Sequence, residues 1–482
     1  MPTSYKVTFW DHRHRPDRRK PWMVRWTVNG REFSESYLTK TQADGRKAEL
    51  LVAAASHQPF DTETGLPLAE LRKRQEEQNS VTWYQHGRNY VEARWDGAPA
   101  KTRTTWADAL ASVTFELVKS KTGMPNKLLV RRALYGWAFN VNRWTDEPPV
   151  EVAKALAWVA RNSVDVSELA DPKMVRRLLA AISVKLDGTK AAASTTLRKR
   201  RILNHVLGRA VEDGLLTANP LPSVQWQPPR AEEEVDPEYV MSPEQAAAML
   251  EAVGRQGRRG PRLVAFFGCM YYAGMRPGEV VHLRKDRCVL PVEGWGKLNL
   301  NGNSPRVGSS WTDSGASHDP RGLKHRPEKA TRPVPIPPEL VKLLREHIEL
   351  YGTAPDGRLF RTFRNGMVQE SGYGVVWAAA RADVFSEAEQ ATPLAKRPYD
   401  ARHAGISLWL ASGVPVAECA RRAGHSIAVL LRVYAKCIHG DEDHANRLIT
   451  ERLQRRTTST PTTEDLSRTC PVLSGGNSQR RS

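Results

Sequence analysis

The sequence predicts a mainly helical α+β protein in three parts: a small N-terminal β-sheet plus helix module, a helical domain and a mixed α/β domain. Alternation of apolar and polar residues is clearest at the N-terminal end, whereas a helical period dominates the middle of the chain. After a strong helix-start signal at Ser242, short strand-like segments return among further helices. The length of 482 residues corresponds to roughly three domains of ordinary size, in agreement with this division.

The N-terminal module is expected to span residues 1–60 and to begin with three strands. Apolar side chains alternate with polar ones over residues 5–9 and 22–28, which indicates two half-buried strands. The pair Asn29-Gly30 is a strong two-residue hairpin signal, so the segment from Phe33 to Tyr37 is predicted to be the returning strand.

A helix and a linker follow these strands. Thr39 and Gln42 have the spacing of a capping box, which predicts a helix that runs to about Ser56. The next segment is rich in Pro, Gly, Asp and Thr, and it predicts a linker over residues 61–79.

The loop between the first two strands is strongly basic. Residues 1–31 contain eight Lys or Arg and two Asp or Glu, a local net charge of +6. A basic loop on a small sheet suits contacts with nucleic-acid phosphates, although a solvated loop in an arginine-rich chain explains the same pattern. The candidate contact residues are Arg13, Arg15, Arg18, Arg19 and Lys20.

Residues 80–226 are expected to form a helical domain, whose clearest helix follows Ser194. Its apolar stripe at i, i+3, i+4 and i+7 consists of Leu203, Val206, Leu207 and Ala210. The opposite side carries four consecutive positive charges, which predicts one face for the core and one for a nucleic-acid backbone. These charges are Arg198, Lys199, Arg200 and Arg201.

A break in composition predicts a second linker over residues 227–239, followed by a third domain over 240–455. Ser242 and Gln245 flank a proline in the pattern of a capped helix start. Strands are predicted near 288–290 and 297–301 and at 332–336, with an extended loop over 302–323. Residues 456–482 lack periodicity and are expected to be a disordered tail.

Composition favours a polyanionic partner and excludes several classes of protein. The net charge is +19, and nucleic acid is the leading candidate partner. The best apolar run, from Leu263 to Met275, is too short for a membrane span, and no apolar signal segment opens the chain. Five cysteines without a CxxC pair argue against a disulfide scaffold or a zinc site, so a cytoplasmic protein is expected. Cys437, His439 and His444 lack a fourth ligand, and no metal is expected there.

Four segments of the third domain carry candidate functional residues. In chain order they are Arg276 with Glu279, Tyr399 with Arg402, Gly424 with His425, and Tyr434. Taken singly, each has an ordinary structural explanation, such as a surface ion pair for Arg276 or a core position for Tyr434.

Taken together, the order and spacing of these residues resemble those of the tyrosine recombinase (phage integrase) family. More specifically, the chain resembles the large actinobacterial integrases with an N-terminal arm-binding domain. His425 lies nine residues before Tyr434, and Arg402 lies 32 residues before it. The resemblance covers most of the chain. It implies an arm-binding module at 1–60, a helical core-binding domain at 80–226 and a mixed α/β tyrosine-recombinase catalytic domain at 240–455.

The resemblance also implies a role for each candidate residue. Two guanidiniums that grip the non-bridging phosphate oxygens neutralise charge in the transition state, while a tyrosine attacks phosphorus. Because the phosphodiester energy is conserved in the covalent intermediate, no cofactor is expected. The implied roles are phosphate binding for Arg276 and Arg402, nucleophile for Tyr434, phosphate contact or proton transfer for His425, general acid for Lys324 (with Lys329 as the alternative), and orientation of Arg276 for Glu279.

One position departs from the family pattern. Tyr399 occupies the place where most members carry a histidine, and a phenol donates a hydrogen bond but is a poor base near neutrality. Tyr399 is therefore expected to contact the phosphate without taking over the proton-transfer role of that histidine. His403 is adjacent to Arg402, and we interpret it as a packing residue.

These inferences predict a site-specific DNA recombinase that integrates or excises a phage or other mobile element through a 3′-phosphotyrosyl intermediate. The expected partners are double-stranded DNA attachment sites, a homotetramer on DNA, and an excisionase or a host DNA-bending protein, in the nucleoid of a bacterial host. A resolvase or type IB topoisomerase-like enzyme and a catalytically silent DNA-binding regulator are the alternatives.

Overall fold

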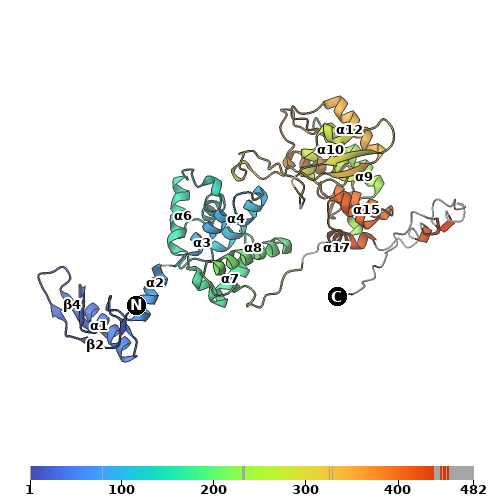
Figure 1. Ribbon diagram of the computed structural model, residues 1–482. Coiled ribbons are helices and arrows are strands. Elements are labelled where there is room, and N and C mark those ends of the chain that lie inside the picture. The colour runs from blue at the N-terminus through green and yellow to red at the C-terminus, as the bar shows by residue number, and fades with distance from the viewer. Residues whose placement is uncertain are drawn as a thin grey trace, which may run out of the picture. The chain divides into compact units, whose positions relative to one another are not determined.

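The computed structural model describes residues 2–78, 80–230, 234–324, 326–327, 329–438, 446–447, 449–451 and 453–454 (Figure 1). The chain divides into two compact units. The first comprises residues 1–98 and 105–229, and the second comprises 99–104 and 230–482. The division at 229/230 falls inside the segment expected to be the second linker.

The N-terminal part of the first unit is a small antiparallel sheet with one covering helix. The strands of this sheet are β2 (Val7–Phe9), β3 (Arg13–His14), β4 (Trp22–Val28) and β5 (Arg31–Tyr37), and the helix is α1 (Lys40–Ala55). Two short strands, β1 (Thr3–Ser4) and β6 (Phe60–Asp61), form a separate two-stranded sheet. β4 is central and pairs with β2, β3 and β5. Asn29 and Gly30 both have positive φ, as the predicted hairpin turn requires, and the Thr39–Gln42 capping box is present.

Two local expectations differ from the structure. The basic loop contains a short strand, β3, because Arg13 and His14 pair with Met23 and Trp22 of β4. The first part of the expected linker is also folded onto the module, since β6 pairs with β1 and Leu66 is buried. Burial of apolar side chains holds this segment against the module, although its Pro and Gly content predicts a linker.

The rest of the first unit is helical, as predicted. Its α-helices are α2 (Leu68–Gln78), α3 (Trp83–Ala93), α4 (Ala100–Thr114, of which residues 105–114 belong to this unit), α5 (Lys127–Ala133), α6 (Val150–Asn162), α7 (Pro172–Ile182) and α8 (Ala193–Glu212), with shorter turns η1 (Leu134–Ala138), η2 (Val141–Arg143) and η3 (Val166–Ala170). The predicted apolar stripe of α8 is confirmed, because Leu203, Val206, Leu207 and Ala210 are fully buried. The helices α3, α4, α6, α7 and α8 gather into one bundle in Figure 1.

The second unit combines helices with a three-stranded antiparallel sheet. Its α-helices are α9 (Pro243–Arg255), α10 (Val264–Tyr272), α11 (Pro277–His282), α12 (Pro338–Tyr351), α13 (Glu370–Val384), α14 (Glu387–Gln390), α15 (Asp400–Ala411), α16 (Val416–Ala423) and α17 (Ile427–Ile438). Its strands are β7 (Cys288–Val289), β8 (Gly296–Leu300) and β9 (Arg332–Ile336), in that spatial order, and its short turns are η4 (Pro237–Tyr239), η5 (Gly260–Arg262), η6 (Lys285–Arg287) and η7 (Ser309–Trp311).

The apolar helix α10 lies at the centre of this unit and positions the segments that follow it. Phe266 and Phe267 are fully buried, and their rings contact Tyr373 of α13. The capped start of α9 and the strands near 288, 297 and 332 agree with the sequence predictions. The mainly helical fold with a small N-terminal sheet and a second small sheet is therefore confirmed.

Two further expectations concern the C-terminal tail and membrane-spanning helices. The tail at 456–482 lies outside the described residues. Within the described part of the chain, every helix is too short or too polar to cross a lipid bilayer.

Candidate active site

The second unit brings four predicted residues together from separate elements. Arg276 caps the start of α11, Arg402 lies on the first turn of α15, His425 follows α16, and Tyr434 lies on α17. A guanidinium nitrogen of Arg276 donates to the carbonyl of Gly424 at 2.9 Å, and Nη2 of Arg402 lies 2.9 Å from Nε2 of His425. These residues, which belong to separate segments of the sequence, thus lie in one cluster in the structure.

Arg402 is held rigidly inside this cluster. Its side chain is fully buried, Nη1 donates to the carbonyl of Gly274, and Nη2 donates to the carbonyl of Ala423 at 2.7 Å. Burial and the nearby charge of Arg276 lower the pKa of Arg402. A buried guanidinium next to a like charge is stabilised by an anion, so this position favours an anionic ligand.

A buried carboxylate organises the arginines. Glu279 is 2% exposed; it accepts from Nη1 of Arg276 at 2.9 Å and from both terminal nitrogens of Arg332, at 3.0 and 2.8 Å. Burial alone would raise the pKa of Glu279, but the guanidiniums of Arg332 and Arg276 outweigh it and hold that pKa at about 2. Glu279 therefore contacts Arg276 as predicted, and Arg332 is a further member that sequence reasoning missed.

The sequence does not reveal the role of Arg332, because Arg332 lies far along the chain from its partner Glu279. The sequence predicts a strand at 332–336, but 53 residues separate Arg332 from Glu279. Bidentate pairing across such a separation leaves no periodic trace in the sequence.

The cluster carries a net positive charge and unpaired donors. Arg276, Arg332 and Arg402 contribute three positive charges against the one negative charge of Glu279, which leaves a net of two positive charges. Nε of Arg402, Nε of Arg332 and Nδ1 of His425 are buried and have no hydrogen-bond partner among the described residues. Buried N–H groups without partners are costly, and acceptor oxygens of an anion would satisfy them.

His425 is a neutral donor in this arrangement. Burial first, and then the charges of Arg402 and Arg276, lower the pKa of His425 to about 3. Because a guanidinium nitrogen can only donate, Nε2 of the neutral ring accepts from Arg402 and the ring proton resides on Nδ1. The unpartnered Nδ1–H is thus available to an acceptor oxygen.

Tyr434 is fully buried beside this cluster, and its hydroxyl lies 2.9 Å from Nδ1 of His403. The tyrosine interrupts its own helix, with φ −114° and ψ 20°. Its ring centroid lies 6.4 Å from that of His425. The interpretation of His403 as a packing residue is therefore wrong, because the histidine hydrogen-bonds the candidate nucleophile.

Tyr399 and Lys324 take different positions relative to the cluster. The ring of Tyr399 contacts the ring of His403 at a centroid distance of 5.1 Å, and the guanidinium carbon of Arg402 lies 5.9 Å from the Tyr399 ring centre. Lys324 and the alternative Lys329 are both exposed, and within the described residues no contact joins either lysine to the cluster. His439 and His444, where no metal is expected, lie outside the described residues.

Most of the predicted basic contact residues are accessible. In the N-terminal module Arg13, Arg18, Arg19 and Lys20 are exposed and Arg15 is half-buried; on α8 Arg198 and Arg201 are exposed and Arg200 is half-buried. Lys199 is a correction: it is buried, and its Nζ lies 2.6 Å from Oγ of Ser112 and 3.4 Å from a carboxylate oxygen of Asp108. Its position beside the apolar face of α8 turns it inward.

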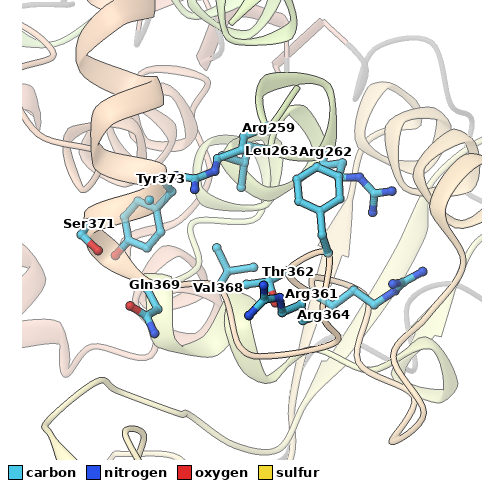
Figure 2. Close-up of a pocket in the computed structure, with 12 residues that line it drawn as sticks. Arg259, Arg262, Leu263, Arg361, Thr362, Arg364, Val368, Gln369, Ser371 and Tyr373 are labelled. Carbon is cyan, nitrogen blue, oxygen red and sulfur yellow. The ribbon is translucent and has the colours of Figure 1, made fainter. Parts of the chain in front are cut away.

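The second unit, which holds the arginine cluster, also contains a basic pocket of about 390 Å³ (Figure 2). Its lining includes Arg259, Arg262, Arg361 and Arg364 and contains neither aspartate nor glutamate among the described residues. The guanidinium of Arg262 lies 4.7 Å from the ring centre of Phe363, which is 53% exposed. Arginines interleaved with an exposed aromatic ring are typical of nucleic-acid contact surfaces.

The fold is similar to that of integrases of known structure. No protein-family model matches the sequence, and no curated protein matches it. The structure is similar to that of the Tn1549 transposon integrase in complex with transposon right end DNA, with 16% identity and a TM-score of 0.50 over 78% of this chain and 100% of that chain.

Two further solved structures are similar at lower scores. The lambda integrase dimer bound to a COC′ core site has 12% identity and a TM-score of 0.43 over 90% of this chain and 93% of that chain. The XerH site-specific recombinase bound to difH substrate has 12% identity and a TM-score of 0.42 over 73% of this chain and 96% of that chain.

We predict that Gly424→Ala disrupts the cluster, because Gly424 combines a positive φ of 65° with close approach to Arg332. An added Cβ would overlap Nη1 of Arg332 and lie 3.3 Å from Nη1 of Arg276. We expect a loss of about 1–2 kcal/mol from the backbone and about 1–3 kcal/mol more from the overlap. Hydrogen exchange of peptides around the substituted residue measures the free energy of local opening.

The matched control is Gly214→Ala. Gly214 also has a positive φ, of 72°, but a Cβ there meets nothing within 4 Å. Equal losses for the two variants would show that the approach of Arg332 to Gly424 places no constraint on the site.

Proposed function

We propose that this protein is a site-specific DNA recombinase that cleaves and rejoins DNA through a 3′-phosphotyrosyl intermediate formed on Tyr434. The observation that carries the proposal is the position of a buried tyrosine hydroxyl beside a net positive cluster with three buried side-chain nitrogens that have no hydrogen-bond partner among the described residues. A phosphodiester provides both the anion and the acceptor oxygens that this cluster favours. The order of the residues along the chain, which resembles the tyrosine recombinase family, supports the same conclusion.

The charges of the cluster suit the transition state of phosphoryl transfer. Attack by the Tyr434 oxygen converts a singly charged phosphodiester into a pentavalent species with more negative charge on its equatorial oxygens. The net charge of two positive units around Arg276 and Arg402 therefore stabilises the transition state more than the ground state. Nδ1–H of His425 and Nε–H of Arg402 are the donors for these oxygens.

The leaving 5′-oxygen needs a proton, and we assign this role to Lys324, with Lys329 as the alternative. Both lysines are exposed in the segment that precedes β9. Energy of the phosphodiester is kept in the tyrosyl ester, so rejoining reverses the same steps with a DNA hydroxyl as the attacking group.

The remaining parts of the chain supply DNA contacts in this proposal. The exposed arginines of the N-terminal module bind arm-type sites, and those of α8 bind the backbone at the core site. The biological outcome is integration or excision of a phage or other mobile element by a homotetramer on two duplexes, in the nucleoid of a bacterial cell. An excisionase or a host DNA-bending protein would then set the direction of the reaction.

Tyr434→Phe is expected to bind DNA with nearly unchanged affinity and to form no covalent adduct, because the substitution removes only the nucleophilic oxygen. The substrate is a nicked duplex that contains the core sequence selected by the full chain from random-sequence duplexes. Denaturing gels detect the protein–DNA adduct. Tyr272→Phe, in the same unit but outside the cluster, is the control and should form adduct like the unmodified protein. An adduct formed by Tyr434→Phe would disprove the assignment of the nucleophile.

We expect the arginine-lined pocket to contact DNA phosphates. Replacing Arg259 and Arg364 together by alanine should weaken binding to all sequences to a similar extent. The slope of log K against log salt should fall by about one for each phosphate that the double variant no longer binds. Titrations at several salt concentrations measure this slope, with Lys342→Ala, an exposed charge on α12, as the control. An unchanged slope for the double variant would exclude the pocket from the DNA-binding surface.

A further inference from the structure

His403 lies where a general base would accept the proton of the Tyr434 hydroxyl. A phenol with an ordinary pKa near 10 is almost entirely protonated at neutral pH, so its proton must leave as the oxygen attacks. Nδ1 of His403 lies 2.9 Å from the Tyr434 hydroxyl, within hydrogen-bond reach of that proton. The ring centroids of the two residues are 5.7 Å apart.

The other titratable groups nearby are less suited to the task. Tyr399 is a phenol, and it contacts the ring of His403. Nε2 of His425 accepts from Arg402, which leaves a donor and no free acceptor on that ring. Arg402 and Arg276 are cations and cannot accept a proton.

We propose that His403 is the general base for cleavage and accepts the Tyr434 proton at Nδ1 as the phenolic oxygen attacks phosphorus. This inference rests on the proposed function. The bond from the Tyr434 oxygen to phosphorus forms, the bond from phosphorus to the 5′-oxygen breaks, and the 5′-oxygen takes a proton from a separate donor. In the rejoining step His403 returns its proton to the Tyr434 oxygen.

The surroundings keep His403 ready to accept a proton. Burial first lowers its pKa, to about 4; Asp400 opposes this shift, whereas Arg402 and Arg397 add to it. Tyr399 and Tyr434 pack against the ring, and the ring of His425 stacks with that of Tyr434. The imidazole is therefore neutral at neutral pH, and the negative charge of a bound phosphodiester would raise its pKa and strengthen it as a base.

His403→Asn separates proton transfer from simple positioning. The asparagine side-chain oxygen accepts a hydrogen bond near the place of Nδ1 but cannot take up a proton. We expect single-turnover cleavage to fall about 10²–10⁴-fold, with DNA affinity unchanged. The remaining rate should rise up to about tenfold per pH unit between about pH 7 and 9, because attack then depends on ionisation of the phenol. The unmodified protein should show no such rise.

Two further measurements keep the result decisive. Added imidazole should accelerate His403→Ala, because a free base replaces the missing one. A duplex with sulfur in place of the bridging 5′-oxygen needs no proton on its leaving group, so it should restore cleavage by Lys324→Ala and leave the defect of His403→Asn. The control for loss of a buried histidine is His347→Asn, in the same unit and also with a pKa lowered to about 4 by burial.

The outcomes distinguish this inference from the proposed function. If the unmodified protein forms no adduct, the proposed function fails. If it forms adduct and His403→Asn cleaves at the same rate with the same pH profile, His403 only positions Tyr434 and the inference is overturned. Failure of imidazole to accelerate His403→Ala would also count against proton transfer.

Discussion

The structure of the site depends on one buried interaction, the contact of the Glu279 carboxylate with Arg276 and Arg332. Both guanidiniums bond to a side chain that is 2% exposed, so neither can turn toward solvent without leaving a buried charge unpaired. Arg276 in turn bonds the carbonyl of Gly424, directly before His425. One carboxylate thus sets the positions of residues that are far apart in the sequence.

The same interaction explains how several like charges can be concentrated in one place. Carbonyl oxygens of Gly274 and Ala423 accept from Arg402, and Glu279 neutralises part of the remaining charge. The compensation is incomplete, because three guanidiniums face one carboxylate. A site with this residual charge and with fixed donors stabilises added negative charge without reorganising, which is the main requirement for catalysis of phosphoryl transfer.

Sequence reasoning predicted the elements better than the contacts between them. Periodicity and caps located α1, α8, α9 and β9, because local backbone chemistry decides where such elements begin. The folded segment at 61–67, predicted as part of a linker, and the inward Lys199 were mispredicted, since burial by distant residues outweighs local composition. Arg332 and the bond from His403 to Tyr434 could not be derived, because they depend on how β9, α11, α15 and α17 meet in space.

The central claim is that the Tyr434 oxygen becomes esterified to a DNA 3′-phosphate inside this arginine cluster. Mass spectrometry of the trapped adduct, after nuclease and protease digestion, locates the modified residue directly. The account predicts a nucleotide 3′-phosphate on the peptide that contains Tyr434 and on no other tyrosine peptide. A nucleotide on a different residue, or DNA joined through its 5′-phosphate, would contradict it.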